Sequence, residues 1–282
     1  MRPRPATGRK ALDLFIRLLS SVGALIGIFF LVWILWEVMQ RGAAAINWDF
    51  FTQIPPAPGD AGGGVANAIV GTVFMTLIAT VLGVPIGMMA GVYLSEYGRK
   101  TKFGEFIRFS TNVMMGIPSI IVGLFIYAIM VAPMGYFSGW AGGVSLAIIM
   151  IPVVARTTED MLTLVPNSLR ESVLALGAPR WKMTIGVVFR AAKSGLITGS
   201  LLAVARVSGE TAPLLFTALN NVFWPDNLSE PTSNLTVTIF NFAMSPYDDW
   251  NQLAWGASLL ITFGVLIITI LARVIFKEVK TR

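Results

Sequence analysis

The chain has 282 residues, of which 55% are hydrophobic and 13% are charged, with a mean hydropathy of +0.72 and a net charge of +6. A soluble domain has about 25% charged residues, so this composition excludes an ordinary water-exposed domain and favours a membrane protein. The sequence contains no Cys and no His, which excludes disulfides and thiolate metal sites and argues against a catalytic triad or a zinc site.

Apolar stretches of about twenty residues predict transmembrane helices, because a helix of that length crosses the hydrocarbon core. The expected spans are residues 18–36, 66–94, 109–131, 143–156, 195–217 and 252–272. The third and fourth are separated by an uncharged Pro- and Gly-rich segment. The predicted fold class is an all-α integral membrane protein with six transmembrane helices.

The distribution of basic residues predicts the orientation. Of the 21 Lys and Arg residues, 19 fall in the N-terminal tail, the second–third loop, the fourth–fifth loop and the C-terminal end. These regions share one side of the membrane, so both termini are expected in the cytoplasm. The basic residues form short clusters between apolar runs, which favours membrane lipid and not nucleic acid as the partner. A competing interpretation, a cleavable signal peptide over residues 1–45, conflicts with the polar Glu37, Gln40 and Arg41 that precede its small residues.

The second span carries Gly83, Gly87 and Gly91. This small-xxx-small spacing lets another helix backbone approach closely, and helix packing is the preferred interpretation. Pro85 and Pro118 each remove a helix hydrogen bond, so bends are expected there. Ser119 follows Pro118 and offers a hydroxyl to a path through the membrane.

The fourth–fifth loop predicts a short amphipathic helix over about 167–178, which begins after Pro166 and stops at Gly177. Leu169, Val173, Leu174 and Leu176 make one side of it apolar. It would either lie at the lipid headgroups or fit the groove of a soluble partner. The residue pattern leaves both open.

The fifth span contains two charges, Arg206 and Glu210. An Arg at the bilayer centre costs roughly 2.5–3.5 kcal/mol, so such residues usually face the protein interior. A spacing of four places the two side chains on one helical face, close enough to pair, and Ala203, Gly199 and Gly195 extend that face. The pair either fixes packing or presents a guanidinium to an anion. If Glu210 pairs with Arg206 at rest, an anion would compete for the same donors in a gated exchange. Thr211, Ser119 and Asn112 are the further candidates for lining residues.

Several of these segments resemble a known family. Glu171 and Gly177 match the EAA motif of bacterial ABC importer permeases, although Ser172 and Val173 replace its alanines and its later Pro is absent. The run Leu174–Lys182, the segment 205–219 that contains Arg206 and Glu210, Asn241–Pro246 and the closing 271–276 are similar to phosphate importer permeases of the PstA type. The resemblance covers about residues 65–276.

The resemblance implies a type I ABC importer permease in a bacterial plasma membrane. It divides the chain into residues 1–64 (tail, first span and outer loop), a permease core over 65–276 and a cytoplasmic tail over 277–282. The implied partners are a related second permease, two copies of an ATP-binding subunit and an extracytoplasmic phosphate-binding protein, and phosphate is the implied substrate. Arg206 and Glu210 are assigned to its pathway. The residues assigned to the ATPase contact are Glu171, Ser172, Leu174, Ala175, Leu176, Gly177 and Ala178.

The sequence has no G-x-x-x-x-G-K-[ST] loop to bind nucleotide phosphates. The chain is therefore not expected to be an enzyme, and no cofactor is expected. Alternatives remain. The residues alone do not separate phosphate from sulfate, molybdate or phosphonate, because Arg pairs with any of them. A secondary transporter acting alone would show inverted repeats, which the sequence lacks, and a membrane scaffold would leave Arg206 and Glu210 without a transport role.

Overall fold

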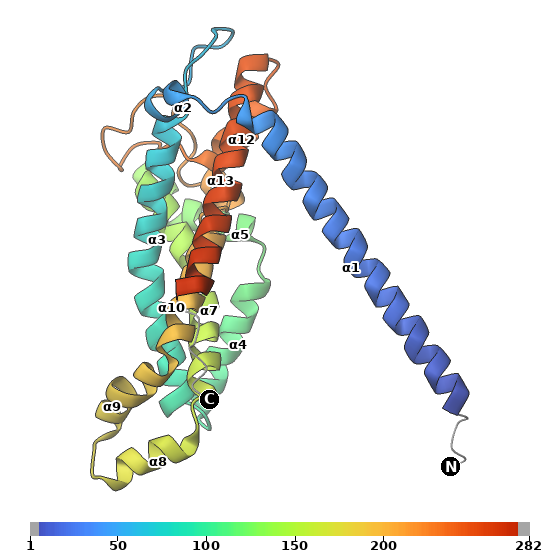
Figure 1. Ribbon diagram of the computed structural model, residues 1–282. Helices are drawn as coiled ribbons and strands as arrows, with labels where there is room; N and C mark the ends of the chain where they lie inside the picture. The colour runs from blue at the N-terminus through green and yellow to red at the C-terminus, as the bar shows by residue number, and fades with distance from the viewer. Residues whose placement is uncertain (1–5, 276–282) are drawn as a thin grey trace.

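A computed structural model describes residues 6–275 of the chain. The predicted tail 277–282 lies outside the described residues, as do five basic residues used to predict orientation: Arg2, Arg4, Lys277, Lys280 and Arg282. All regular elements of the described part are helices (Figure 1). The longer ones are α1 (Ala6–Ala43), α3 (Ala66–Val92), α4 (Lys102–Gly116), α5 (Ser119–Ile126), α7 (Gly139–Thr163), α8 (Asn167–Ala175), α10 (Phe189–Val207), α12 (Leu235–Ala243) and α13 (Asp248–Ile275). The short ones are α2 (Trp48–Thr52), α6 (Ala132–Met134), α9 (Arg180–Met183), α11 (Ala212–Leu215) and the π-helical turns η1 (Tyr93–Tyr97), η2 (Tyr127–Val131) and η3 (Thr184–Val188).

Helix α7 is the most buried of the long helices, and α3 packs along it (Figure 1). A Cβ atom added to Gly87 would lie 2.7 Å from the carbonyl oxygen of Ile151, and one added to Gly91 would lie 2.5 Å from that of Ala155. The glycine stripe predicted from the sequence therefore serves helix packing, since only glycine permits this backbone approach. Small residues of α10 also pack on α7, where Gly199 lies against the side chain of Thr157.

Three of the four buried apolar clusters among the described residues run along the bundle. The outer cluster joins α2, α3, α12 and α13 around Phe50 and Phe242, whose ring stacks on Trp250 with centroids 4.5 Å apart. The middle cluster joins α3, α7 and α10, with Met75 and Met150 fully buried. The third packs the end of α7 against η3 and α10. Close packing at three levels holds the helices at fixed positions.

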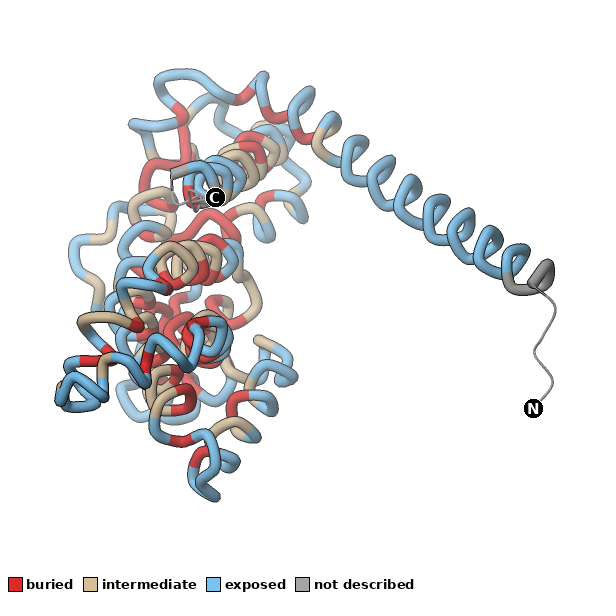
Figure 2. Tube along the Cα trace, turned by 60° about the horizontal axis from the view of Figure 1, so that its bottom comes forward, coloured by how far each residue is buried: buried red, intermediate tan, exposed pale blue. Residues whose placement is uncertain are grey.

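Helix α1 runs away from the bundle and meets it only near its C-terminal end (Figures 1 and 2). Its residues 10–34 are exposed, whereas Gly42 is buried against Leu259 of α13. From Leu18 to Ile34 this exposed surface carries no charged side chain, and an apolar surface of that length has no stable solvent other than the bilayer.

The structure corrects the predicted spans. Five helices are long and apolar enough to cross a membrane, and a sixth span results if the bent pair α4 and α5 counts as one. The predicted third span, 109–131, is this pair, and the chain turns by 102° between Gly116 and Ser119. At Pro85, by contrast, α3 continues as one helix. The predicted fourth span, 143–156, was too short, because α7 extends to Thr163 beyond the apolar stretch.

The predicted fifth span, 195–217, was placed too far along the chain, because the apolar helical segment runs over Arg180–Val207. Helix α10 ends at Val207, and a turn separates it from α11. The segment between the predicted fifth and sixth spans contains the largely buried helix α12. Asn234 begins α12 by accepting a hydrogen bond from the Val237 amide, a common helix start that the sequence reading overlooked.

Candidate functional site

A cavity of 540 Å³ lies between the α4–α5 break, α7 and the end of α10. Met114, Met115, Ile117, Phe125, Ile148 and Val153 give it an apolar wall. Among the described residues that line it, Arg206 and Glu210 carry the charges and Ser119 adds a hydroxyl. The structure therefore brings together three of the five predicted pathway residues from segments far apart in the sequence.

Arg206 lies in the last turn of α10, at the negative end of the helix dipole, where a cation is favoured. The buried side of α10 passes through Gly199, Ala203 and Val207, each four residues from the next. Arg206 stands beside that line and is exposed to the cavity. Arg206 is three residues beyond Ala203 and seven beyond Gly199, so the predicted face of small residues does lead up to it.

The predicted pairing of Arg206 with Glu210 is also absent. Four ion pairs join described residues, and none of them includes Arg206. The spacing argument fails because the helix ends at Val207. Glu210 lies in the turn that follows, where its carbonyl accepts a hydrogen bond from the Thr236 hydroxyl at 2.8 Å. That bond fixes the turn to α12, while both charged groups face the same cavity.

Ser119 is the first residue of α5, directly after the break. The first amides of a helix lack intrahelical acceptors and carry partial positive charge, so a helix start at the wall favours an anion. The other two candidates lie elsewhere. Asn112 is exposed on α4, and Thr211 precedes α11, and neither lines this cavity. Their place in the pathway stays a prediction.

The predicted amphipathic helix is α8, which ends at Ala175, earlier than expected. Gly177 has φ +80, a left-handed conformation that glycine adopts without strain. Figure 1 shows α8 and α9 projecting from the end of the bundle opposite α2. Leu176 is 87% exposed, Leu174 is exposed, and Val173 packs against the third buried cluster. The predicted ATPase-contact residues therefore form a protruding surface.

The sequence reading missed two ion pairs close to α8. Arg170 pairs with Glu96 at 2.8 Å, with side chains 10% and 4% exposed, and Arg108 pairs with Glu159 at 2.6 Å. The partners are 74 and 51 residues apart in the chain. No local spacing signals such pairs, because only the packing of α3, α4, α7 and α8 brings them together.

Apart from one guanidinium, one carboxylate and one hydroxyl, the described side chains that line the cavity are apolar. No group of three or more His, Cys, Asp or Glu residues that could hold a metal occurs in the described part of the chain. An exposed guanidinium and a helix start can bind an oxyanion by charge and hydrogen bonds. The apolar remainder of the wall offers such an anion few competing polar contacts.

Comparisons with known proteins agree with this geometry. The model of a family described as "Binding-protein-dependent transport system inner membrane component" matches residues 83–281. The chain is 53% identical to the "Phosphate transport system permease protein PstA" of Yersinia pestis over 93% of its own length and 89% of that protein. It is 49% identical to the protein of the same name in Haemophilus influenzae, over 93% of each chain.

Solved structures show the fold. A chain of a bacterial alginate ABC transporter superposes with a TM-score of 0.67 at 14% identity, over 97% of this chain and 96% of that one. A chain of the MetNI methionine ABC transporter superposes with a TM-score of 0.62 at 19% identity, over 74% and 93%. The fold is that of a type I ABC importer permease, and the apolar helices are those of a multi-pass inner-membrane protein. The family match and these relatives show that the chain belongs to the binding-protein-dependent transport system inner membrane components.

Proposed function

We propose that this chain is the transmembrane permease subunit of an ATP-driven importer of inorganic phosphate and forms half of the translocation path with a related second permease. The observation that carries the proposal is the apolar cavity into which Arg206, Glu210 and the start of α5 are directed. Its guanidinium is free of any ion pair with described residues. An anion can therefore bind it without first displacing Glu210. The relatives named PstA support phosphate as that anion.

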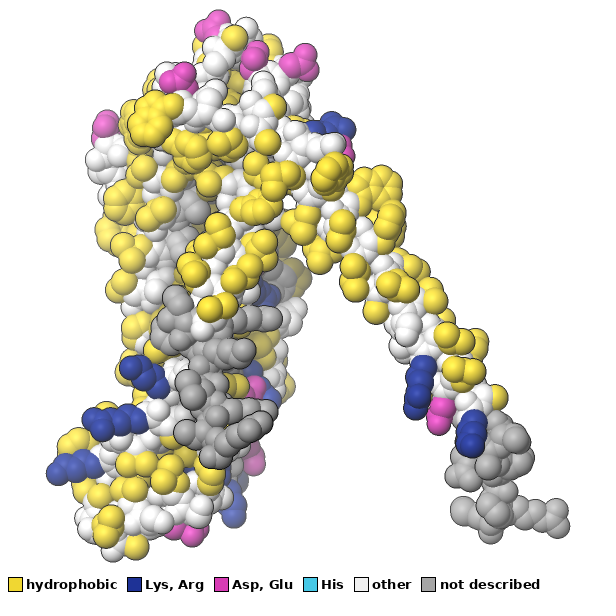
Figure 3. Space-filling model, viewed as in Figure 1, with side chains coloured by type: hydrophobic (Ala, Val, Ile, Leu, Met, Phe, Trp, Pro, Cys, Tyr) yellow, Lys and Arg dark blue, Asp and Glu magenta, His cyan; other side chains and the backbone are white. Residues whose placement is uncertain are grey.

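The surface supports an orientation and a set of partners. On the face drawn in Figure 3, acidic side chains gather at the α2 end, and Lys and Arg lie mainly towards the α8–α9 end. We place the basic end, with both termini, in the cytoplasm. Two copies of an ATP-binding subunit then bind at this end. One copy contacts α8 of this permease, and the other contacts the related second permease. A phosphate-binding protein delivers substrate at the opposite end.

Glu210 offers a reason for preferring phosphate to other oxyanions. A carboxylate only accepts hydrogen bonds. At neutral pH inorganic phosphate keeps a P–OH proton that it can donate, whereas sulfate and molybdate have none and are repelled. Arg206 thus attracts every oxyanion, and Glu210 favours those that carry a proton, phosphate and phosphonate, over sulfate and molybdate.

The test is uptake of labelled phosphate in cells that lack this gene, restored with the native chain, Arg206→Gln, Glu210→Gln or Arg190→Gln at matched protein levels. Arg190 is the control, because it is an exposed arginine at the other end of α10. Sulfate and molybdate are added as competitors.

We expect the native chain and Arg190→Gln to restore uptake that sulfate does not inhibit. Arg206→Gln is expected to lose it, and Glu210→Gln to become sensitive to sulfate. Normal transport by Arg206→Gln would show that this arginine serves only the structure. Failure of the native chain to restore uptake would overturn phosphate as the substrate, and uptake of another oxyanion would identify the replacement.

A further inference from the structure

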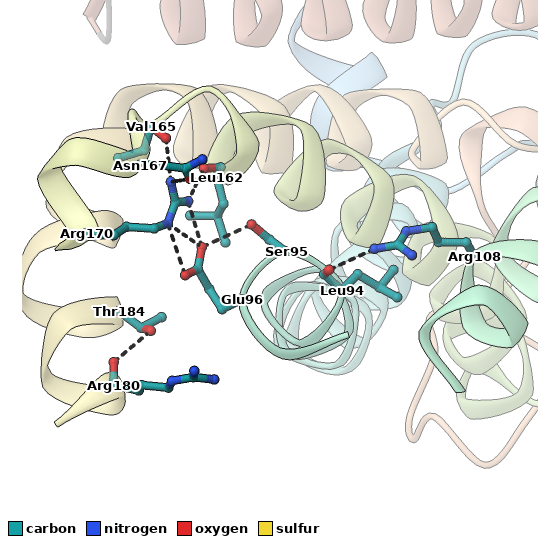
Figure 4. A network of polar contacts seen from close by, with 10 residues as sticks. All are labelled: Leu94, Ser95, Glu96, Arg108, Leu162, Val165, Asn167, Arg170, Arg180 and Thr184. Atoms are coloured by element: carbon teal, nitrogen blue, oxygen red, sulfur yellow. Dashed lines mark hydrogen bonds and ion pairs between the residues drawn. The ribbon is translucent and has the colours of Figure 1, made fainter. Parts of the chain in front are cut away.

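Helix α3 ends in the π-helical turn η1, and two arginines from different helices bind this turn (Figure 4). Arg170 of α8 donates to the carboxylate of Glu96, with Nη2 and Oε1 2.8 Å apart. Arg108 of α4 donates from Nη2 to the carbonyl oxygen of Leu94 at 2.9 Å. Leu94 and Glu96 are two residues apart, so a single turn of backbone lies between the two guanidinium groups.

Arg170 ties the protruding helix to the bundle. Besides Glu96 it donates to the carbonyl oxygens of Leu162, at 2.6 Å, and of Val165. These carbonyls lie at the end of α7 and just beyond it. The guanidinium thus connects α8, α7 and η1, and Ser95 also donates to the Glu96 carboxylate. A buried charge with this many partners is costly to pull away from any one of them.

Arg108 continues the connection towards the cavity. It bonds both η1 and Glu159 of α7. From Arg108, helix α4 runs on to Met114 and Met115 and then to the break before Ser119, all of which line the cavity with Arg206. A displacement of η1 must therefore either move α4 or disturb the ion pair between Arg108 and Glu159.

We propose that η1 is the junction through which movement of α8 reaches the cavity wall, with Arg170 and Arg108 as its positioning residues. The proposal rests on the proposed function, in which α8 contacts an ATP-binding subunit. Closure of that subunit moves α8, Arg170 transfers the movement to η1 and to the end of α7, and Arg108 passes it to α4. The cavity wall then shifts relative to Arg206.

The alternative is that the two arginines only stabilise the bundle. The two roles differ in what happens when the chain is folded and assembled but the junction is loosened. A stabilising role predicts that α8 and the cavity respond to nucleotide together or not at all. A junction predicts that α8 still responds while the cavity does not.

The chain has no Cys, so one introduced cysteine is a unique reporter within it. Two reporters are placed in separate full-length chains assembled with the partner subunits: Ser168→Cys, exposed at the start of α8, and Met115→Cys, exposed on the cavity wall. Each is combined with Arg170→Lys, with Glu96→Gln or with the control Arg156→Gln. The control removes an exposed pair with Asp160 within α7. The rate of thiol labelling is measured without nucleotide and with nucleotide trapped on the ATP-binding subunits.

In the native and Arg156→Gln backgrounds, trapped nucleotide is expected to change both labelling rates by about tenfold. In Arg170→Lys and Glu96→Gln, Ser168→Cys is expected to respond as in the native background, while the response of Met115→Cys falls below about twofold. Phosphate uptake is also expected to fall in Arg170→Lys and Glu96→Gln. A native response of Met115→Cys in both variants would overturn the proposal, and so would joint loss of both responses. Absence of any phosphate uptake by the native chain would instead overturn the proposed function, since the labelling responses are read separately from uptake.

Discussion

Arg206 and Arg170 are arginines of one chain in opposite environments. Arg206 is exposed in an apolar cavity and has no ion pair with a described residue, whereas Arg170 is buried and shares its protons among a carboxylate and two carbonyls. A charge that a fold keeps without a partner is available to a ligand. A charge that a fold surrounds with partners is part of the framework. We therefore expect replacement of Arg206 to reduce transport more than stability. Replacement of a partner of Arg170 is expected to lower the stability of the fold.

The largest expected effect tests the framework side of this comparison. Glu96→Ala leaves the Arg170 guanidinium buried without its carboxylate, and we expect the free energy of unfolding to fall by about 3 kcal/mol. Denaturation of the purified chain in detergent micelles measures it. Arg206→Ala, at the exposed site, is expected to change the same quantity by less than about 0.5 kcal/mol. Equal losses in the two variants would contradict the distinction.

The second prediction concerns the contact between α3 and α7, which both arginine sites need. Gly91→Ala places a Cβ atom 2.5 Å from the Ala155 carbonyl oxygen, so we expect a loss of about 2 kcal/mol in the free energy of unfolding. Gly264→Ala is the matched control, because a Cβ atom there meets nothing within 4 Å. It is expected to stabilise α13 by about 0.5–1 kcal/mol. If both variants stabilised the chain, the backbones of α3 and α7 would not be in close contact at Gly91.

The third prediction separates charge from shape at the cavity. Arg206→Lys keeps the positive charge but loses the planar fork that binds two oxygens of one anion. We expect phosphate uptake to fall by about tenfold, which corresponds to about 1.4 kcal/mol. Initial rates of labelled phosphate uptake at matched protein levels measure it. Uptake equal to that of the native chain would mean that a point charge suffices.

The smallest effect is expected where an arginine is paired but exposed. Arg156 pairs with Asp160 at 3.2 Å on the surface of α7. Such pairs contribute about 0–1 kcal/mol, so Arg156→Gln is expected to alter neither uptake nor stability beyond about 0.5 kcal/mol. A larger effect on uptake with unchanged stability would indicate that a partner subunit binds this arginine.

The features that could be predicted from the sequence are those that depend on residues close together in the chain. The apolar runs predicted the membrane helices, the glycine stripe predicted a close helix contact, and Gly177 predicted the end of the protruding helix. Each depends on residues within a few positions of one another. Arg206 was identified for the same reason, because a charge within an apolar run is visible without any fold.

What was missed depends on contacts between distant segments or on where a helix stops. The Arg170–Glu96 pair requires the packing of α8 against η1, and no pattern within either segment indicates it. The predicted Arg206–Glu210 pair assumed one continuous helix, but the backbone turns after Val207. The length of α7 was underestimated because its charged residues ended the apolar run, although Glu159 is neutralised by Arg108.

The break between α4 and α5 has a consequence for hydration. The last carbonyls of one helix lack donors within that helix, and the first amides of the next lack acceptors. Pro118 supplies no amide of its own. Inside a membrane these groups need protein or water as partners, and the cavity beside them is large enough to hold water. We expect water to fill this cavity, so an anion that followed the proposed route would give up its hydration shell in stages, first among this water and then at the guanidinium. Its passage would then be a series of small desolvation steps in place of one large barrier.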